Sequence, residues 1–173
     1  KALEYIEKGL KWFYDDNELI REQVNLSVKM GRTEELMEKL GKDIEYDAGN
    51  STLYLMRGIL YEKNGYQEAA KKDYLEALEL NPGYFIAAYN LGAMFYNDGV
   101  EIMNTAKDIL DNTKYAKEKE KADILFKQAI PHFEAALEID PKDSDTAQRL
   151  VRLYARTGDD AKYQALKKKM EGM

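Results

Sequence analysis

The side chains that most often carry out enzymatic chemistry are sparse in this chain and do not form a catalytic pattern. His132 is the only histidine in 173 residues, and there is no cysteine. A zinc site needs several His or Cys ligands, and a Ser or Cys nucleophile needs a nearby base. Because His132 stands alone beside Pro131, we expect it to be a packing or surface residue.

The acidic residues do not form a metal-binding pattern either. Asp140, Asp143 and Asp145 lack the glycine and the terminal glutamate of a calcium loop. Asp15-Asp16 and Asp159-Asp160 lie at expected helix starts, where carboxylates accept bonds from free backbone amides. A glycine-rich phosphate loop is also missing from the sequence. We therefore predict a non-catalytic protein that has no metal site and needs no cofactor.

The composition predicts a folded all-α protein. Apolar residues make up 45% of the chain and there are three prolines, while Ala, Leu, Glu and Lys, which favour helix, are abundant. The formal charge of −6 argues against nucleic acid as a partner, since phosphates require a basic surface. No apolar run approaches the roughly 20 residues of a membrane span. Because Lys1 lies within a helical pattern, we expect an upstream segment, which could carry a targeting signal.

Four glycines recur at a regular interval. Gly31, Gly65 and Gly99 are 34 residues apart, and Gly158 follows after 34 plus 25. Each glycine fits the end of the first helix of a helical hairpin, because the left-handed conformation found there is favourable only for glycine. A period of 34 residues predicts stacked helical hairpins that share one core.

This period divides the chain into repeats at 17–50, 51–84, 85–143 and 144–173, preceded by an orphan second helix at 1–14. The second and third repeats place small residues where two helices approach closely, large residues where gaps must be filled, and proline after the second helix. These signature positions are Tyr54, Gly58, Tyr61, Ala70, Tyr74, Ala77 and Pro82 in the second repeat, and Leu91, Gly92, Phe95, Ala129, Phe133, Ala136 and Pro141 in the third.

This pattern resembles the tetratricopeptide repeat family over nearly the whole chain. The resemblance implies an all-α superhelix, a single solenoid of about nine helices over 1–173. Arg57 departs from it, because the family usually has an apolar residue at this position. The first repeat is degenerate, but its apolar spacing still predicts helices over 17–30 and 33–46, with Thr33 as an N-cap.

The two ends of the chain differ from the central repeats. The lysine-rich second helix of 144–173 is expected to be a polar cap that closes the stack. The segment 1–14 is expected to be the second helix of a preceding repeat, and a natural N-terminal cap is the alternative. Trp12 within this segment is expected to be a core residue.

The third repeat contains an insertion of 25 residues. Thirty residues separate Gly99 from Ala129, whereas five separate Gly65 from Ala70. We predict a helical-hairpin arm over about 100–128 that lengthens both helices by about 12 residues, or roughly 18 Å. Val100, Met103, Ala106 and Leu110 follow helical spacing in its first helix. Lys114–Glu118 and Lys119–Asp123 are expected to pair in its second helix, and Pro131 predicts a kink or break near Lys127.

The insertion is similar to those of bacterial tetratricopeptide repeat proteins of the Bacteroidetes type. Residues 88–92 and 97–101, which flank its start, carry this resemblance. Many such proteins are exported, so the resemblance implies a periplasmic or exported location.

The resemblance also implies a partner-binding groove, because the first helices of the family line a concave face that holds peptides or helices. The groove is expected to be apolar and aromatic in the middle and cationic at both ends. The transferred positions are Arg21, Asn25, Leu55, Ile59, Ile86, Tyr89, Tyr96, Asn97, Gln148, Arg152 and Arg156, with Val28, Lys29, Glu62 and Ala93 beside them.

Two functions remain open from the sequence. The first is a scaffold that binds a protein or peptide partner along this groove. The second is a structural module in which the arm and the solenoid ends mediate homo-oligomerisation and another copy fills the groove. A clamp for chaperone tails is not expected: Arg21 and Asn25 have the spacing of its first part, but Met56, Ile86 and Asn90 do not supply the rest.

Overall fold

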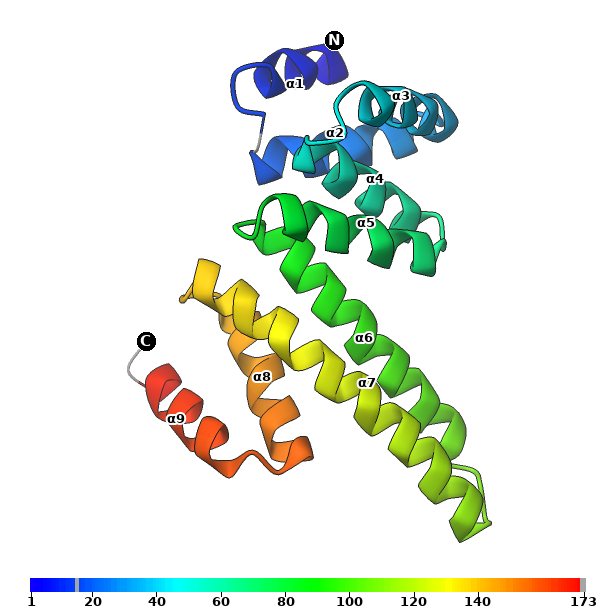
Figure 1. Ribbon diagram of the computed structural model, residues 1–173, viewed down its shortest axis with the longest axis vertical. Coiled ribbons are helices and arrows are strands. Elements are labelled where there is room, and N and C mark those ends of the chain that lie inside the picture. The colour runs from blue at the N-terminus through cyan, green and yellow to red at the C-terminus, as the bar shows by residue number, and fades with distance from the viewer. Residues whose placement is uncertain (15, 172–173) are drawn as a thin grey trace. The chain divides into compact units, whose positions relative to one another are not determined.

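The computed structural model describes residues 1–14 and 16–171, and this part of the chain is helical with no strand (Figure 1). The chain forms two compact units, Lys1–Ala87 and the residues from Ala88 onward. The first unit contains α1 (Ala2–Leu10), α2 (Asn17–Lys29), α3 (Thr33–Tyr46), α4 (Ser51–Lys63) and α5 (Gln67–Leu80). α6 (Phe85–Ala106) begins at its end, and the second unit continues with α7 (Asn112–Ile139), α8 (Ser144–Thr157) and α9 (Asp160–Glu171).

Nine helices among the described residues agree with the expected all-α fold. The helices predicted over 17–30 and 33–46 are confirmed by α2 and α3. Pro82 and Pro141 follow the ends of α5 and α7, as expected of residues that cannot continue a helix. The exact assignment of residues to repeats stays a prediction.

Three of the four periodic glycines end a helix in the expected way. Gly31, Gly65 and Gly158 have φ values of 68°, 79° and 76°. The amide of the residue after each glycine donates to the carbonyl oxygen five positions before it, at 2.8, 2.9 and 3.0 Å. These bonds satisfy carbonyl groups at the helix ends. The glycines therefore form the tight connections of three helical hairpins.

Gly99 differs, and its expected role as a helix end is wrong. It lies inside α6, which continues to Ala106. A Cβ atom at Gly99 would lie 2.9 Å from Cε1 of Phe126 and 3.2 Å from the carbonyl oxygen of Ala122. The glycine is needed because α6 and α7 approach closely at this point, since the insertion has moved the turn further along the chain.

Gly58 and Gly92 confirm the close-approach role predicted for them. A Cβ atom would lie 2.9 Å from the Tyr74 ring at Gly58 and 3.1 Å from the Phe133 ring at Gly92. Tyr74 and Phe133 are themselves fully buried. In each hairpin an aromatic ring thus fills the space that a missing side chain leaves.

Helix starts confirm the capping role predicted for Asp16 and Asp159, and Asp143 has the same role. Asp16, Asp143 and Asp159 accept hydrogen bonds from backbone amides three residues later, at 2.9, 2.8 and 3.1 Å. Asp15 lies outside the described residues. Thr33 is not an N-cap: α3 begins at Thr33, and Arg32, at the cap position, offers no side-chain acceptor and pairs with Glu35 instead.

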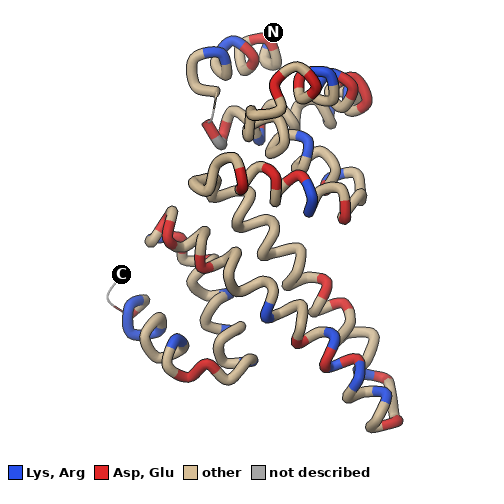
Figure 2. The backbone as a smooth tube through the Cα atoms, viewed as in Figure 1, with Lys and Arg blue, Asp and Glu red and all other residues tan. Residues whose placement is uncertain are grey.

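The insertion forms a long antiparallel hairpin of α6 and α7, with 22 and 28 residues (Figure 1). Both charge signs alternate near its tip (Figure 2), and the expected Lys119–Asp123 pair is present at 3.0 Å. Leu110 lies beyond the end of α6 and is 98% exposed, so its assignment to the first helix is wrong. α7 continues through Pro131, so the helix is not broken there, and the alternative expectation of a kink near Lys127 stays a prediction.

Aromatic and aliphatic side chains fill the core of each unit. In the second unit, Phe126, Phe133, Leu150 and Leu153 are buried together. Trp12, in contrast, is 83% exposed. Its expected core position is wrong because α1 ends at Leu10, and Trp12 falls in the connection that follows it.

A matched pair of substitutions tests the close approach of α6 and α7. Gly99→Ala is expected to lower the free energy of unfolding by about 1–3 kcal/mol, because the new methyl group overlaps Phe126 and the α7 backbone. Gly41→Ala in α3, where nothing lies within 4 Å of an added Cβ, is expected to raise it by about 0.5–1 kcal/mol. Urea denaturation followed by circular dichroism measures the free energy of unfolding of both variants. The same change in both would contradict the close approach of α6 and α7 at Gly99.

Candidate functional site

Tyrosines of α6 and arginines of α8 form a shared surface in the second unit. The guanidinium carbon of Arg149 lies 5.4 Å from the ring centroid of Tyr89 and 5.7 Å from that of Tyr96. It also lies 5.8 Å from the ring centroid of Phe133. Such distances allow cation–π attraction. Arg149 is therefore the residue that joins α8 to the aromatic residues of α6.

Helical spacing explains why these side chains meet. Tyr89 and Tyr96 are seven residues apart on α6, and Arg149, Arg152 and Arg156 are separated by three and four residues on α8. Both spacings place side chains on one face of a helix. The α6/α8 surface is defined here as Tyr89, Tyr96, Asn97, Gln148, Arg149, Arg152 and Arg156.

Asp145 holds the N-terminal end of this surface in place. Its carboxylate accepts hydrogen bonds from the Tyr89 hydroxyl and, at 3.0 Å, from Nε of Arg149. Burial and the bond to Asp145 raise the pKa of Tyr89, so the hydroxyl keeps its proton and remains a donor. The hydrogen bonds from Tyr89 and Arg149 lower the pKa of Asp145. The carboxylate is therefore charged at neutral pH.

Asp123 has the same role at the other end of the surface. Its carboxylate lies 3.2 Å from Nε of Arg156 and 3.0 Å from Nζ of Lys119. Burial opposes ionisation of Asp123, but bonds from Lys119 and Arg156 lower its pKa. The Arg156 guanidinium also lies 4.1 Å from the ring centroid of Phe126. These contacts fix the orientation of Arg156.

Arg152, between these two arginines, is exposed and makes no ion pair with any described residue, although its charge helps to lower the pKa of Asp145. Asn97 and Gln148 are exposed as well, and Tyr89 and Tyr96 are partly exposed. The α6/α8 surface thus combines two positioned arginines, one unpaired arginine and partly exposed aromatic rings. A surface of this kind can bind an acidic and apolar segment of another molecule.

The residues predicted for the groove differ in burial and belong to both units. Tyr89, Tyr96 and Arg156 belong to the α6/α8 surface, whereas Leu55, Ile59 and Ile86 are buried and therefore pack in the core. Arg21 is exposed and Asn25 half-buried on α2 of the first unit.

Sequence reasoning missed Arg149. The available signal was its spacing of four residues from Asp145 and of seven from Arg156 on the same helix.

Arg57 has a structural role that explains its departure from the family pattern. Its guanidinium pairs with Asp73 through bonds of 2.7 and 2.8 Å and lies between the rings of Tyr54 and Tyr61. The Asp73 side chain is buried. An apolar residue at position 57 would leave this carboxylate buried without a partner, which is costly.

His132 packs against an aromatic ring. Its ring is stacked on Phe95, with 5.6 Å between centroids and 10° between planes, and burial lowers its pKa. The described residues contain no group of three or more His, Asp or Glu side chains that could hold a metal ion. Among the same residues, no helix has both the length and the apolar composition needed to cross a membrane.

His132 also makes stability depend on pH. Its pKa is lower in the folded state than the value of about 6.5 in the unfolded chain, so the unfolded chain binds more protons below that pH. Acidification through this range should therefore reduce stability. His132→Phe keeps an aromatic ring stacked on Phe95 and removes the titrating imidazole. Between about pH 7.5 and about pH 5.5 this variant should therefore lose less stability than the wild-type chain. Urea denaturation at both pH values tests this, and equal losses would contradict it.

Comparison with known proteins identifies a repeat in the first unit. Residues 51–84 match the tetratricopeptide repeat family model. A curated relative, the photosystem I assembly protein Ycf3 of Acaryochloris marina, is 28% identical over 106 residues, which are 61% of this chain and 57% of Ycf3. The match thus spans little more than half the length of that relative.

Solved structures share the fold over most of the chain. A TPR repeats protein from Bacteroides fragilis has a TM-score of 0.55 and 25% identity, covering 90% of this chain and 74% of that protein. A human IFIT1 dimer with m7Gppp-AAAA has a TM-score of 0.66 and 18% identity, covering 99% of this chain but 36% of IFIT1. These likenesses confirm the predicted all-α helical-repeat fold.

Proposed function

We propose that this chain, which matches the tetratricopeptide repeat family over residues 51–84 and shares its fold with a TPR repeats protein, is a non-catalytic scaffold that holds a segment of a partner protein on the α6/α8 surface. The observation that carries this proposal is the placement of Arg152. It is exposed without an ion pair among the described residues, while Arg149 and Arg156 on either side are paired with Asp145 and Asp123.

This arrangement favours a particular kind of partner segment. A carboxylate of the partner would pair with Arg152, because a charge-assisted bond to arginine can be bidentate. A neighbouring apolar or aromatic side chain would pack on the partly exposed rings of Tyr89 and Tyr96. The paired arginines are already oriented, so little side-chain entropy is lost when the partner binds.

The comparisons support a scaffold role in general terms. The name of Ycf3 describes an assembly protein, which is a role that protein interactions serve. The IFIT1 structure contains a capped oligonucleotide. For this chain we propose a protein rather than a nucleic acid as partner, because three arginines in a chain of net charge −6 form a basic surface too small to neutralise a run of phosphates.

The proposal predicts a specific loss of binding. Partner proteins captured by the wild-type chain from a native extract are identified, purified and titrated against variants by isothermal titration calorimetry. Arg152→Glu is expected to weaken binding at least tenfold, or about 1.4 kcal/mol, because it replaces attraction by repulsion. Lys168→Glu on α9 changes the net charge equally at an exposed position outside the surface and should leave affinity nearly unchanged.

Two outcomes would contradict this function. Equal affinity of wild type and Arg152→Glu would place binding elsewhere. A wild-type chain that captures only its own copies, with a mass that rises with concentration in sedimentation experiments, would favour the self-assembly alternative.

A further inference from the structure

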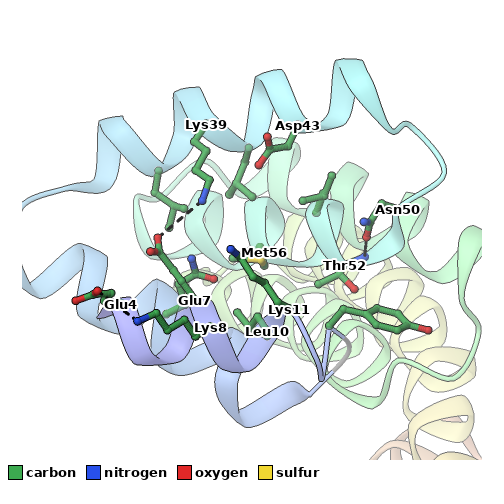
Figure 3. A pocket seen from close by; sticks show the side chains of 15 residues that line it. Glu4, Glu7, Lys8, Leu10, Lys11, Lys39, Asp43, Asn50, Thr52 and Met56 are labelled. Carbon is green, nitrogen blue, oxygen red and sulfur yellow. Dashed lines mark hydrogen bonds and ion pairs between the residues drawn. The ribbon is translucent and has the colours of Figure 1, made fainter. Parts of the chain in front are cut away.

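The first unit contains a cavity of about 480 Å³ next to α1, α3 and α4 (Figure 3). This volume falls within the range of about 300–1,000 Å³ that is typical of small-molecule sites. None of the residues of the α6/α8 surface lines it. Five apolar side chains contribute to its wall: Leu10, Leu36, Leu40, Leu53 and Met56.

The charged groups that line this cavity balance one another. Glu4, Glu7 and Asp43 supply three carboxylates, and Lys8, Lys11 and Lys39 supply three ammonium groups. A ligand with a large net charge of either sign would therefore meet as much repulsion as attraction. A zwitterion with an apolar body fits this lining better, because each of its charges can face an opposite one.

Only some of these charges are engaged with each other. Lys8 lies 3.5 Å from Glu4, and Lys39 lies 3.8 Å from Glu7. Lys11 and Asp43 make no ion pair with any described residue. Figure 3 shows the Lys11 side chain extending into the cavity and the Asp43 carboxylate on its α3 side. These two residues leave one positive and one negative group for a ligand.

Gln23 adds an unpaired amide to the same cavity. The residue as a whole is only 5% exposed and lines the cavity, and its amide forms no hydrogen bond with another described residue but reaches solvent through the cavity. Asn50 and Thr52 also line the cavity, but Asn50 caps α4 and the Thr52 hydroxyl is bonded to Tyr84. Because the Gln23 amide both donates and accepts hydrogen bonds, a peptide group of a ligand in the cavity is its natural complement.

We propose that this cavity binds a short zwitterionic peptide of two or three residues with apolar side chains. Its terminal ammonium faces Asp43, its carboxylate faces Lys11, and its peptide group bonds to the Gln23 amide. The apolar side chains pack on the leucines and Met56. This site lies within the first unit and is independent of the function proposed for the α6/α8 surface.

The proposal is tested with Leu-Leu, Phe-Leu and Leu-Met as probes and the whole chain carrying a ¹³C label in its methionine methyl groups. The Met56 signal should shift on titration because Met56 lines the cavity, while Met103 on α6 should not respond. N-acetylated and C-amidated forms of the dipeptide that binds best should each bind at least tenfold more weakly. Free leucine distinguishes a peptide site from a site for single amino acids, because a site for single amino acids would bind leucine as tightly as the dipeptides.

Two variants test which charged residue faces each end of the peptide. Asp43→Asn and Lys11→Gln should each weaken dipeptide binding at least tenfold, and the acetylated dipeptide should bind wild type and Asp43→Asn equally. Lys42→Gln is the matched control, because Lys42 pairs with Glu38 and does not line the cavity. Three results would overturn the proposal: no Met56 shift with any of the three dipeptides, free leucine binding at least as tightly as the dipeptides, or unchanged affinity in both variants. The α6/α8 variants should have no effect on this titration, so the two proposals fail separately.

Discussion

The close approach of paired helices at glycine is the constraint on which the second unit depends. Gly92 lies against the ring of Phe133, and Gly99 lies against the ring of Phe126. The same two rings also support the α6/α8 surface. Phe133 lies 5.7 Å from Tyr89 and Phe126 lies 5.6 Å from Tyr96, measured between ring centroids, and both rings contact arginines of α8. Core packing and the orientation of the surface side chains therefore have a common origin.

Charge pairing has different consequences in the two units. Arg57 compensates a buried carboxylate, Asp73, so its charge is used within the first unit. Arg149 and Arg156 pair with partly exposed carboxylates at the edge of a surface. These pairs add little stability by themselves because water screens them, but they orient side chains that could otherwise adopt many rotamers. In this chain arginine is thus a structural residue at position 57, and on α8 it belongs to the surface for which we propose recognition of a partner.

The features that recur in every repeat could be predicted from the sequence. The exact helix ends, and the changes that the insertion causes, could not. The glycine period, the signature positions and the prolines follow from the geometry of a helical hairpin, and these predictions hold for Gly58, Tyr74 and Pro82. Gly99 has the correct spacing for a helix end, but the insertion changed its environment, which the period does not reveal. Trp12 and Leu110 were misplaced because apolar spacing cannot locate the last residue of a helix. Leu55 and Ile59 were expected in a groove, but facing a groove and packing in a core have the same periodicity.

Binding of a partner protein on α6 and α8 can be located by hydrogen–deuterium exchange of the chain with and without a purified partner. Buried amides exchange slowly, so binding should reduce exchange wherever it stabilises local structure. We expect protection in peptides that cover 89–97 and 148–156. Protection confined to the first unit, to α9 or to the tip of the α6–α7 hairpin would contradict it.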